Sequence, residues 1–160
     1  MSGIIGISPD MRSGVVGAWP SGHVIQTIST DTVAQTNVNS TSLVAITGLT
    51  AAITPRSTSN KILVSIVPDS YVGFTGAYYP ILTAELLRGG SSIHLTSTYY
   101  YAEPAANGYM EMGTSCSMDF LDSPNTTSAV TYSVSAKSNV TGPIHYFKIN
   151  STITLMEIAG

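Results

Sequence analysis

The side chains that could perform acid–base chemistry are few and scattered along this 160-residue chain. Of the nine carboxylates, Asp119 and Asp122 are close in sequence, but no second acidic cluster faces them in any regular pattern. Glycoside hydrolysis needs two carboxylates about 5–9 Å apart. The sequence therefore predicts no catalytic site, and a polysaccharide hydrolase using Asp119, Asp122, Glu85 or Glu111 stays only as an alternative.

The remaining reactive side chains do not form a recognisable motif either. His23, His94 and His145 lie far apart, and none has a partner at metal-ligand spacing, so we expect surface or interface histidines and no metal or cofactor. One alternative is that a histidine on the axis of a trimer could hold an ion with three copies. Cys116 is the only cysteine, cannot form an internal disulfide, and is expected to be a buried small apolar residue.

The tyrosines are the surface side chains that indicate a binding function. Tyr71 and Phe74 fall in a Gly-rich stretch that is expected to be a loop, and 99–101 is a run of three tyrosines. Neighbours in a strand point to opposite faces, so some of these rings must be exposed. Exposed aromatic rings stack on sugars or anchor protein contacts, and the alternative is that they pack over the ends of the fold or in a subunit contact. The candidate glycan contacts are Tyr78, Tyr79, Tyr99, Tyr100, Tyr101 and Tyr109.

The composition favours a protein that works within an assembly. Only 9% of residues are charged, against roughly 25% in an average domain, so much of the surface must be Ser, Thr, Asn, Gly and Tyr or be covered by other chains. A monomeric Ser/Thr-faced β-domain is the alternative. The net charge of -3 has no basic patch, which argues against nucleic-acid binding. No apolar run approaches 18 residues and the start lacks signal-peptide features, so neither membrane insertion nor secretion is expected.

Residues 1–22 differ from the rest of the chain. Glycines and prolines separate isolated apolar residues, a pattern too broken for a helix and too apolar for a disordered tail. We interpret this segment as an extended docking arm preceding a domain over 23–160, with a local first strand or a disordered terminus as alternatives. The residues expected to attach the arm to a particle are Ile4, Ile5, Ile7, Met11, Val15, Val16 and Trp19.

From residue 23 onward the pattern predicts an all-β, antiparallel two-sheet sandwich, with a closed barrel as the alternative. The Gly89-Gly90 pair predicts a two-residue hairpin after a strand over 81–87, although a helix over 81–88 competes. The nearly all-apolar stretch 61–67 predicts a strand buried on both faces or lying at an interface, with Ile62, Val64 and Ile66 as candidate subunit contacts. The other expected strands are 24–29, 43–54 with a bulge or kink at Thr47-Gly48, 92–95, 130–136, 144–149 and 153–158, and 109–121 is expected to be one strand or two with a bulge near Gly113.

An ordered set of segments resembles a known group of proteins. The stretch ITPRSTSNKILV at 53–64, LLRG at 86–89, FLDSP at 120–124 with TY at 131–132, and STITLMEI at 151–158 resemble short structural and tail-fibre-like surface proteins of tailed bacteriophages. The resemblance covers about residues 24–160, and the arm less clearly. It implies a virion surface protein, made in the host cytoplasm, with a jelly-roll-like sandwich that forms trimers.

Composition and resemblance together give two main hypotheses. The first is a non-enzymatic virion surface protein, either a capsid decoration or cement protein or a short head or tail fibre component. It would form a homotrimer and attach to other capsid or tail proteins through its N-terminal arm. The alternative is a receptor-binding module that recognises host cell-surface glycans through the tyrosine-rich loops.

Overall fold

The structure is a computed structural model that describes residues 11–12, 15–16, 19–75, 79–100, 108–114 and 116–160. In these residues the regular secondary structure is entirely strand, and no helix is long and apolar enough to cross a membrane. The strands are β1 (Met11–Arg12), β2 (Val15–Val16), β3 (Val24–Asp31), β4 (Thr36–Val38), β5 (Val44–Ile53), β6 (Lys61–Val67), β7 (Ser70–Thr75), β8 (Ile81–Arg88), β9 (Ser91–Tyr99), β10 (Tyr109–Thr114), β11 (Met118–Asp122), β12 (Val130–Ser138), β13 (Ile144–Phe147) and β14 (Thr152–Ile158).

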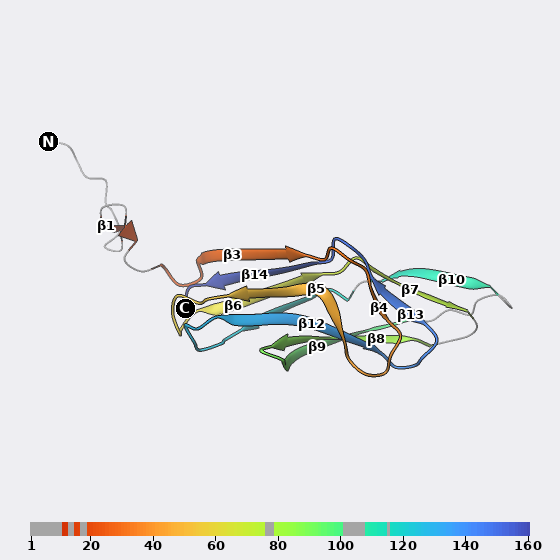
Figure 1. Ribbon diagram of the computed structural model, residues 1–160. Coiled ribbons are helices and arrows are strands. Elements are labelled where there is room, and N and C mark those ends of the chain that lie inside the picture. Colours follow the sequence, from red (N-terminus) through yellow and green to blue (C-terminus); the bar gives the residue numbers. More distant parts are fainter. Residues whose placement is uncertain (1–10, 13–14, 17–18, 76–78, 101–107, 115) are drawn as a thin grey trace.

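The strands form an elongated sandwich of two layers (Figure 1). One layer is the four-stranded sheet β5-β12-β8-β9. The other consists of two four-stranded sheets, β11-β6-β14-β3 and β10-β7-β13-β4. Each strand of one sheet is next in the chain to the strand at the same position in the other, so these two sheets are the halves of one long layer. A short hairpin of β1 and β2 precedes the sandwich.

Counting each continued pair as one long strand gives eight strands in a jelly-roll order. In chain order they are β3/β4, β5, β6/β7, β8, β9, β10/β11, β12 and β13/β14. The long layer then has the order 6-3-8-1 and the second layer the order 2-7-4-5. This interleaving of two Greek keys defines the jelly roll. The expected antiparallel two-sheet sandwich is therefore confirmed.

The break across the long layer is bridged by buried hydroxyl groups together with backbone hydrogen bonds, such as that from the Thr32 amide to the Ser151 carbonyl at 2.8 Å. Thr32 is 3% exposed and Ser151 is fully buried. The hydroxyl of Thr32 donates to the carbonyl of Lys148 at 2.7 Å and accepts from the amide of Ser151 at 3.0 Å. The hydroxyl of Ser151 accepts from the amide of Asp69 at 3.0 Å. These bonds satisfy backbone groups that the interrupted strands leave without a ladder partner, which lets the layer bend without a buried polar penalty.

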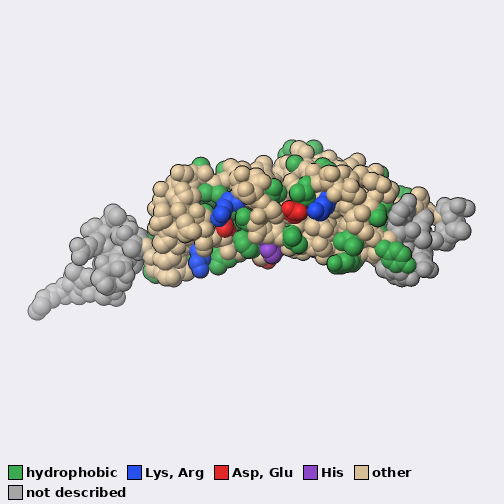
Figure 2. Space-filling view, turned by 90° about the horizontal axis from the view of Figure 1, so that it is seen from below, with side chains coloured by type: hydrophobic (Ala, Val, Ile, Leu, Met, Phe, Trp, Pro, Cys, Tyr) green, Lys and Arg blue, Asp and Glu red, His purple; other side chains and the backbone are tan. Residues whose placement is uncertain are grey.

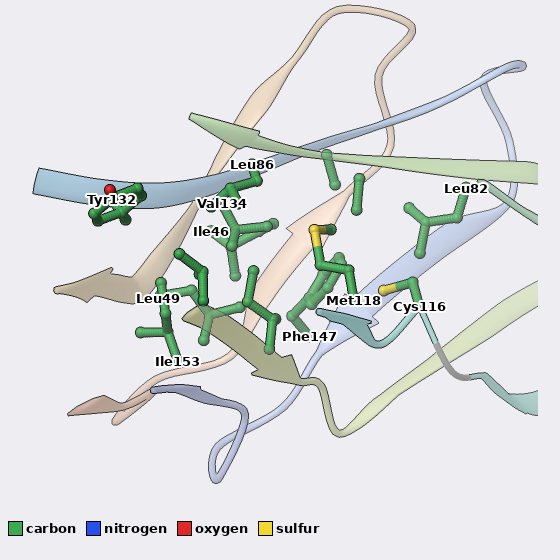
Figure 3. Packing of buried hydrophobic residues seen from close by; sticks show 14 of the residues in the cluster. Ile46, Leu49, Leu82, Leu86, Cys116, Met118, Tyr132, Val134, Phe147 and Ile153 are labelled. Carbon is green, nitrogen blue, oxygen red and sulfur yellow. The ribbon is translucent and has the colours of Figure 1, made fainter. Parts of the chain in front are cut away.

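The core lies between the two layers, and side chains from both point toward each other (Figure 3). Alternate residues of each strand face inward, as the period of two requires. The largest fully buried side chains come from both layers and fill the sandwich along its length. They include Leu49, Ile62, Leu82, Leu86, Tyr132, Phe147, Ile153 and Leu155.

Two predictions made from glycine positions, a hairpin turn and a bulge, were confirmed. Gly89 and Gly90 have φ angles of 56° and 86°, which connect β8 to β9 as a two-residue hairpin, so the competing helix over 81–88 is excluded. Gly48 has a φ of 88° within β5, and the register with β12 shifts between Ser133 and Ser135. The expected bulge in that strand is therefore present.

One expected loop is a strand. The Gly-rich stretch that contains Tyr71 and Phe74 forms β7, and its inward-facing Val72 and Phe74 are buried. Gly73 suggested a loop, but it lies on the outer face, where the ring of Tyr109 covers it. The interpretation as a loop was wrong because this glycine makes room for a neighbouring side chain and does not form a turn.

Candidate functional site

The two ends of the sandwich differ in what they carry (Figure 1). Residues 22 and 23, the root of the N-terminal segment, lie at the end of the sandwich where the C-terminus lies. The strands β7, β10 and β13 lie toward the opposite end. A surface for attachment and a surface for display can therefore occupy opposite ends of the same sandwich.

The root of the expected arm is tied to the C-terminal strand. The amide of Gly22 donates to the carbonyl of Ala159, and the amide of Ala159 donates to the carbonyl of His23, both at 2.8 Å. Trp19 is 41% exposed and lines a hollow of about 260 Å³ with Ile25 and neighbouring polar residues. Of the other expected attachment residues, Met11, Val15 and Val16 belong to the β1–β2 hairpin, and Ile4, Ile5 and Ile7 lie outside the described residues.

The predicted subunit-interface residues of β6 are part of the core of their own chain. Ile62 and Val64 are fully buried and Ile66 is 2% exposed. Their side chains point between the two layers, so they are unavailable to a second chain. The outer face of the strand carries Leu63 and Val67 alternating with Lys61 and Ser65, so only this face could lie at an interface.

The outer face of β11-β6-β14-β3 carries an apolar stripe. Met156, Leu63 and Leu121 pair across three neighbouring strands, with Met156 opposite Leu63 and Leu63 opposite Leu121. Ile158 and Val24 pair in the next outward-facing row of the sheet. Leu121 is 48% exposed, and Val24 is 53% exposed. The other three, Leu63, Met156 and Ile158, are half-buried, and the five residues are here called the outer stripe.

The candidate glycan-binding tyrosines do not form one site. Tyr100 is buried, whereas Tyr79 and Tyr99 are exposed. Tyr99 pairs with the outward-facing Ile81, which places Tyr99 on the outer face of β8 and β9. Tyr109 is exposed on the other layer, in β10. Tyr78 and Tyr101 lie outside the described residues.

A second aromatic group, which sequence reasoning did not assemble, lies on the outer face of β10, β7 and β13. Tyr71 and Tyr146 are opposite each other in register, and their rings stack at 4.4 Å between centroids with planes 14° apart. The Lys148 ammonium lies 4.3 Å from the centroid of the Tyr71 ring. Alternation within β7 would have placed Tyr71 outward had that segment been recognised as a strand. Nothing in the sequence predicts its pairing with Tyr146.

Buried polar groups link elements at three points in the sandwich. Asp122 is 7% exposed and accepts hydrogen bonds from Arg88 and Tyr132 of the opposite layer. Glu157 and His145 are fully buried, so the expectation that every histidine lies at a surface or interface was wrong for His145. Each of these side chains faces the interior from a strand position that alternation assigns to the core.

These polar groups do not resemble a reaction centre. No three His, Cys, Asp or Glu side chains in the described part of the chain lie close enough together to hold a metal ion. Burial raises the pKa of the Cys116 thiol to about 11, so it is protonated and unreactive near neutral pH. The expected buried, apolar role of Cys116 is confirmed, since its side chain is 3% exposed.

The strand order and the core define a jelly-roll sandwich, a fold that hosts several unrelated functions. No protein-family model matches the chain, and no curated protein matches it. Among solved structures it is similar to the subviral particle of infectious bursal disease virus VP2, with 12% identity and a TM-score of 0.48 over 99% of this chain and 38% of that one. It is also similar to the insecticidal delta-endotoxin Cry8Ea1 of Bacillus thuringiensis, with 16% identity and a TM-score of 0.37 over 78% of this chain and 19% of that one.

The chain spans well under half the length of both similar structures. At these identities and TM-scores the similarities bear on the fold alone, and the jelly-roll assignment itself rests on the strand order. Arguments about function therefore come from the chain's own residues.

Proposed function

We propose that this chain is a non-enzymatic structural protein of a virion surface, in keeping with its sequence resemblance to surface proteins of tailed bacteriophages. It self-associates as a trimer and attaches to a capsid or tail protein through its N-terminal arm. The observation that carries the proposal is the eight-stranded jelly roll with an apolar N-terminal segment leaving one end. Jelly rolls of this kind are a common building block of viral capsids.

The sparse charge supports a role in an assembly. Figure 2 shows one face of the molecule, on which charged side chains are few. Two ion pairs join described residues, Arg88 with Asp122 and Lys137 with Glu85. Packing against another subunit removes water from surface charges, and this desolvation costs free energy. The cost is smaller for a surface with so few charges than for an average protein surface.

The outer stripe supports self-association. Its five side chains are distributed over the four strands β11, β6, β14 and β3, and the only charged residue paired with any of them is Lys61, opposite Ile158. Contiguous exposed apolar surface on a soluble domain marks a contact site more often than an accident of composition. A second and third copy of the chain would bury it, in place of the core residues Ile62, Val64 and Ile66.

The root of the arm supports attachment through residues 1–18. Two backbone hydrogen bonds fix residues 22 and 23 to the C-terminal strand, so the segment before them leaves from a defined point. The β1–β2 hairpin folds part of this segment back on itself, so its reach is shorter than the roughly 60 Å of eighteen fully extended residues. Such an arm can contact a neighbouring virion protein while the sandwich stays outside the contact.

The test is deletion of residues 1–18, which leaves Trp19 and the hydrogen-bonded root in place. Particles produced with the truncated chain should lack it, while the truncated chain keeps the β-type circular dichroism spectrum and melting temperature of the full chain. The full chain, produced in the same infected cells, is the control for incorporation. Normal incorporation of the truncated chain would show that the arm does not attach it.

A further inference from the structure

The ring of Tyr109 lies against the outer face of the sheet beside β7. A Cβ atom added at Gly73 would fall within 3.0 Å of the Tyr109 ring carbon that bears the hydroxyl, so the glycine is what lets the ring come so close. Tyr109 is nevertheless 59% exposed. An aromatic ring that rests on a sheet and remains exposed is a flat apolar surface available to a ligand.

Polar groups surround this ring. The Tyr109 hydroxyl donates to Glu111 Oε1 at 2.9 Å. Hydrogen bonds to Glu111 and Tyr146, with desolvation, raise the pKa of Tyr109 to about 12, so its hydroxyl keeps its proton at any physiological pH. The stacked pair of Tyr71 and Tyr146 stands next to it. The group therefore combines an exposed ring face with one carboxylate, neighbouring phenol groups and the ammonium of Lys148, 4.3 Å from the centroid of the Tyr71 ring.

We propose that this group, formed by Tyr71, Gly73, Tyr109, Glu111 and Tyr146 and here called the tyrosine platform, binds a neutral hexopyranose glycan. The apolar face of one pyranose ring stacks on Tyr109, and its hydroxyl groups hydrogen-bond to Glu111 and the neighbouring phenols. The carboxylate of Glu111, bonded to the hydroxyl of the stacking ring, disfavours an anionic sugar on Tyr109 because like charges repel, whereas the Lys148 ammonium lies at the Tyr71 ring. The proposal is independent of particle attachment, since the platform lies toward the end of the sandwich opposite the arm.

A glycan fits these residues better than a protein partner. Hot spots in protein interfaces are aromatic side chains enclosed in desolvated pockets. Here Gly73 makes the centre of the platform flat, and Asn37 lies beside Tyr146 in the next strand, with its side chain bonded to Gln35 at 2.7 Å. A flat ring bordered by a carboxylate and amides matches a sugar, which presents C–H groups on its face and hydroxyl groups on its rim.

The test uses the purified full chain on an array of neutral gluco-, galacto- and manno-oligosaccharides with sialylated counterparts. The strongest ligand is then titrated by calorimetry against three variants. Tyr109→Ala should weaken binding about tenfold or more, because the stacking surface is lost. Gly73→Ala should weaken it similarly while the ring itself is kept, because the new Cβ displaces Tyr109.

Tyr99→Ala is the matched control, because Tyr99 is a 75% exposed tyrosine on the outer face of the other layer. It should leave the affinity unchanged. Melting temperatures of all variants verify that they are folded. The absence of binding to every neutral glycan, a preference for the sialylated ones, or equal affinity for Tyr109→Ala and the unchanged chain would each overturn the proposal. A loss with Tyr99→Ala alone would place the binding surface on β8 and β9 instead.

Discussion

The phenol of Tyr132 in β12 donates a 2.6 Å hydrogen bond to the carboxylate of Asp122 in β11, and so joins the two layers of the sandwich. Nη1 of Arg88, from β8, donates to both oxygens of the same carboxylate at 2.8 and 2.9 Å. Tyr132 is fully buried and Asp122 nearly so. Burial, with the hydrogen bond to Asp122, raises the pKa of Tyr132, which keeps the phenol a donor. This connection is specific, because each partner would be left unsatisfied without the carboxylate.

Asp122→Ala should therefore lower the free energy of unfolding by about 2–4 kcal/mol, since it leaves a buried phenol and a partly buried guanidinium without their acceptor. Urea denaturation measures the change. Asp119→Ala is the control, because Asp119 lies in the same strand with an exposed side chain. We expect it to change stability by less than about 0.5 kcal/mol. Equal stability losses for the two variants would contradict a specific role for Asp122.

The carboxylate of Glu157 is a second buried acceptor, at the end of the sandwich near the termini. It accepts from Gln26 Nε2, the Arg56 amide and Asn60 Nδ2, each at 2.6 Å. Burial alone would raise the pKa of Glu157, but the hydrogen bonds outweigh it, so the pKa lies below its usual value. A carboxyl with a depressed pKa stabilises the fold above its unfolded pKa of about 4.3, and this contribution is lost as the pH falls through the folded value.

Glu157→Gln should reduce the free energy of unfolding at pH 7 by about 1–3 kcal/mol. The NH2 group of the new side chain would face N–H donors that the carboxylate accepts from. The variant should also lose less stability than the unchanged chain when the pH drops from 5 to 3. Urea titrations at several pH values in this window measure both effects. A parallel decline of the two proteins below pH 5 would show that Glu157 does not contribute to acid sensitivity.

His145 predicts a separate pH window. Its ring is fully buried, lies 3.3 Å from the Ser138 hydroxyl through Nε2 and packs 5.7 Å from the Tyr100 ring. Burial lowers the pKa of His145 to about 4. The unfolded chain therefore binds this proton more readily than the folded one. Stability is fully present above pH 6.5 and falls as the pH drops toward 4, by about 3 kcal/mol over the window.

The variant that tests this is His145→Phe, which keeps a ring against Tyr100 and cannot be protonated. Its stability should vary much less than that of the unchanged chain between pH 6.5 and 4.5. His23→Phe serves as the control, because His23 is exposed near the arm, and it should keep the original pH profile. An unaltered profile for His145→Phe would exclude this histidine as the cause.

The sequence predicts features that depend on residues close together in the chain better than features that depend on residues far apart. Alternation in 130–136 and the Gly89-Gly90 turn are local, and both gave strands and a hairpin at the expected places. The strand β7 was missed because Gly73 is explained only by Tyr109, which lies 36 positions later in the chain. The break in the long layer was missed for the same reason, since Thr32 and Ser151 meet only after folding.

The candidate sites show this limit more strongly. Composition predicts that apolar strand residues and tyrosines matter, but not which layer or face each one occupies. Ile62 and Leu63 are neighbours with opposite roles, one in the core and one on the outer stripe. Tyr99 and Tyr109 belong to different layers, although the sequence suggested one surface. Deciding between faces requires knowing which strand is opposite which, and that information is non-local.

The last prediction concerns the outer stripe. Leu63 lies between Met156 and Leu121 in one of the two rows of the stripe. If copies of the chain associate through this stripe, Leu63→Glu places a charge within the contact. The variant should then be a monomer where the unchanged chain is a trimer. Native mass spectrometry at two concentrations measures the difference. Ala45→Glu adds the same charge to an exposed position of β5 in the other layer, so its variant should remain a trimer. Since Leu63 points away from the core, both variants should melt near the unchanged chain. A monomeric unchanged chain at both concentrations would contradict self-association itself, and a trimer that survives Leu63→Glu would move the contact to another face.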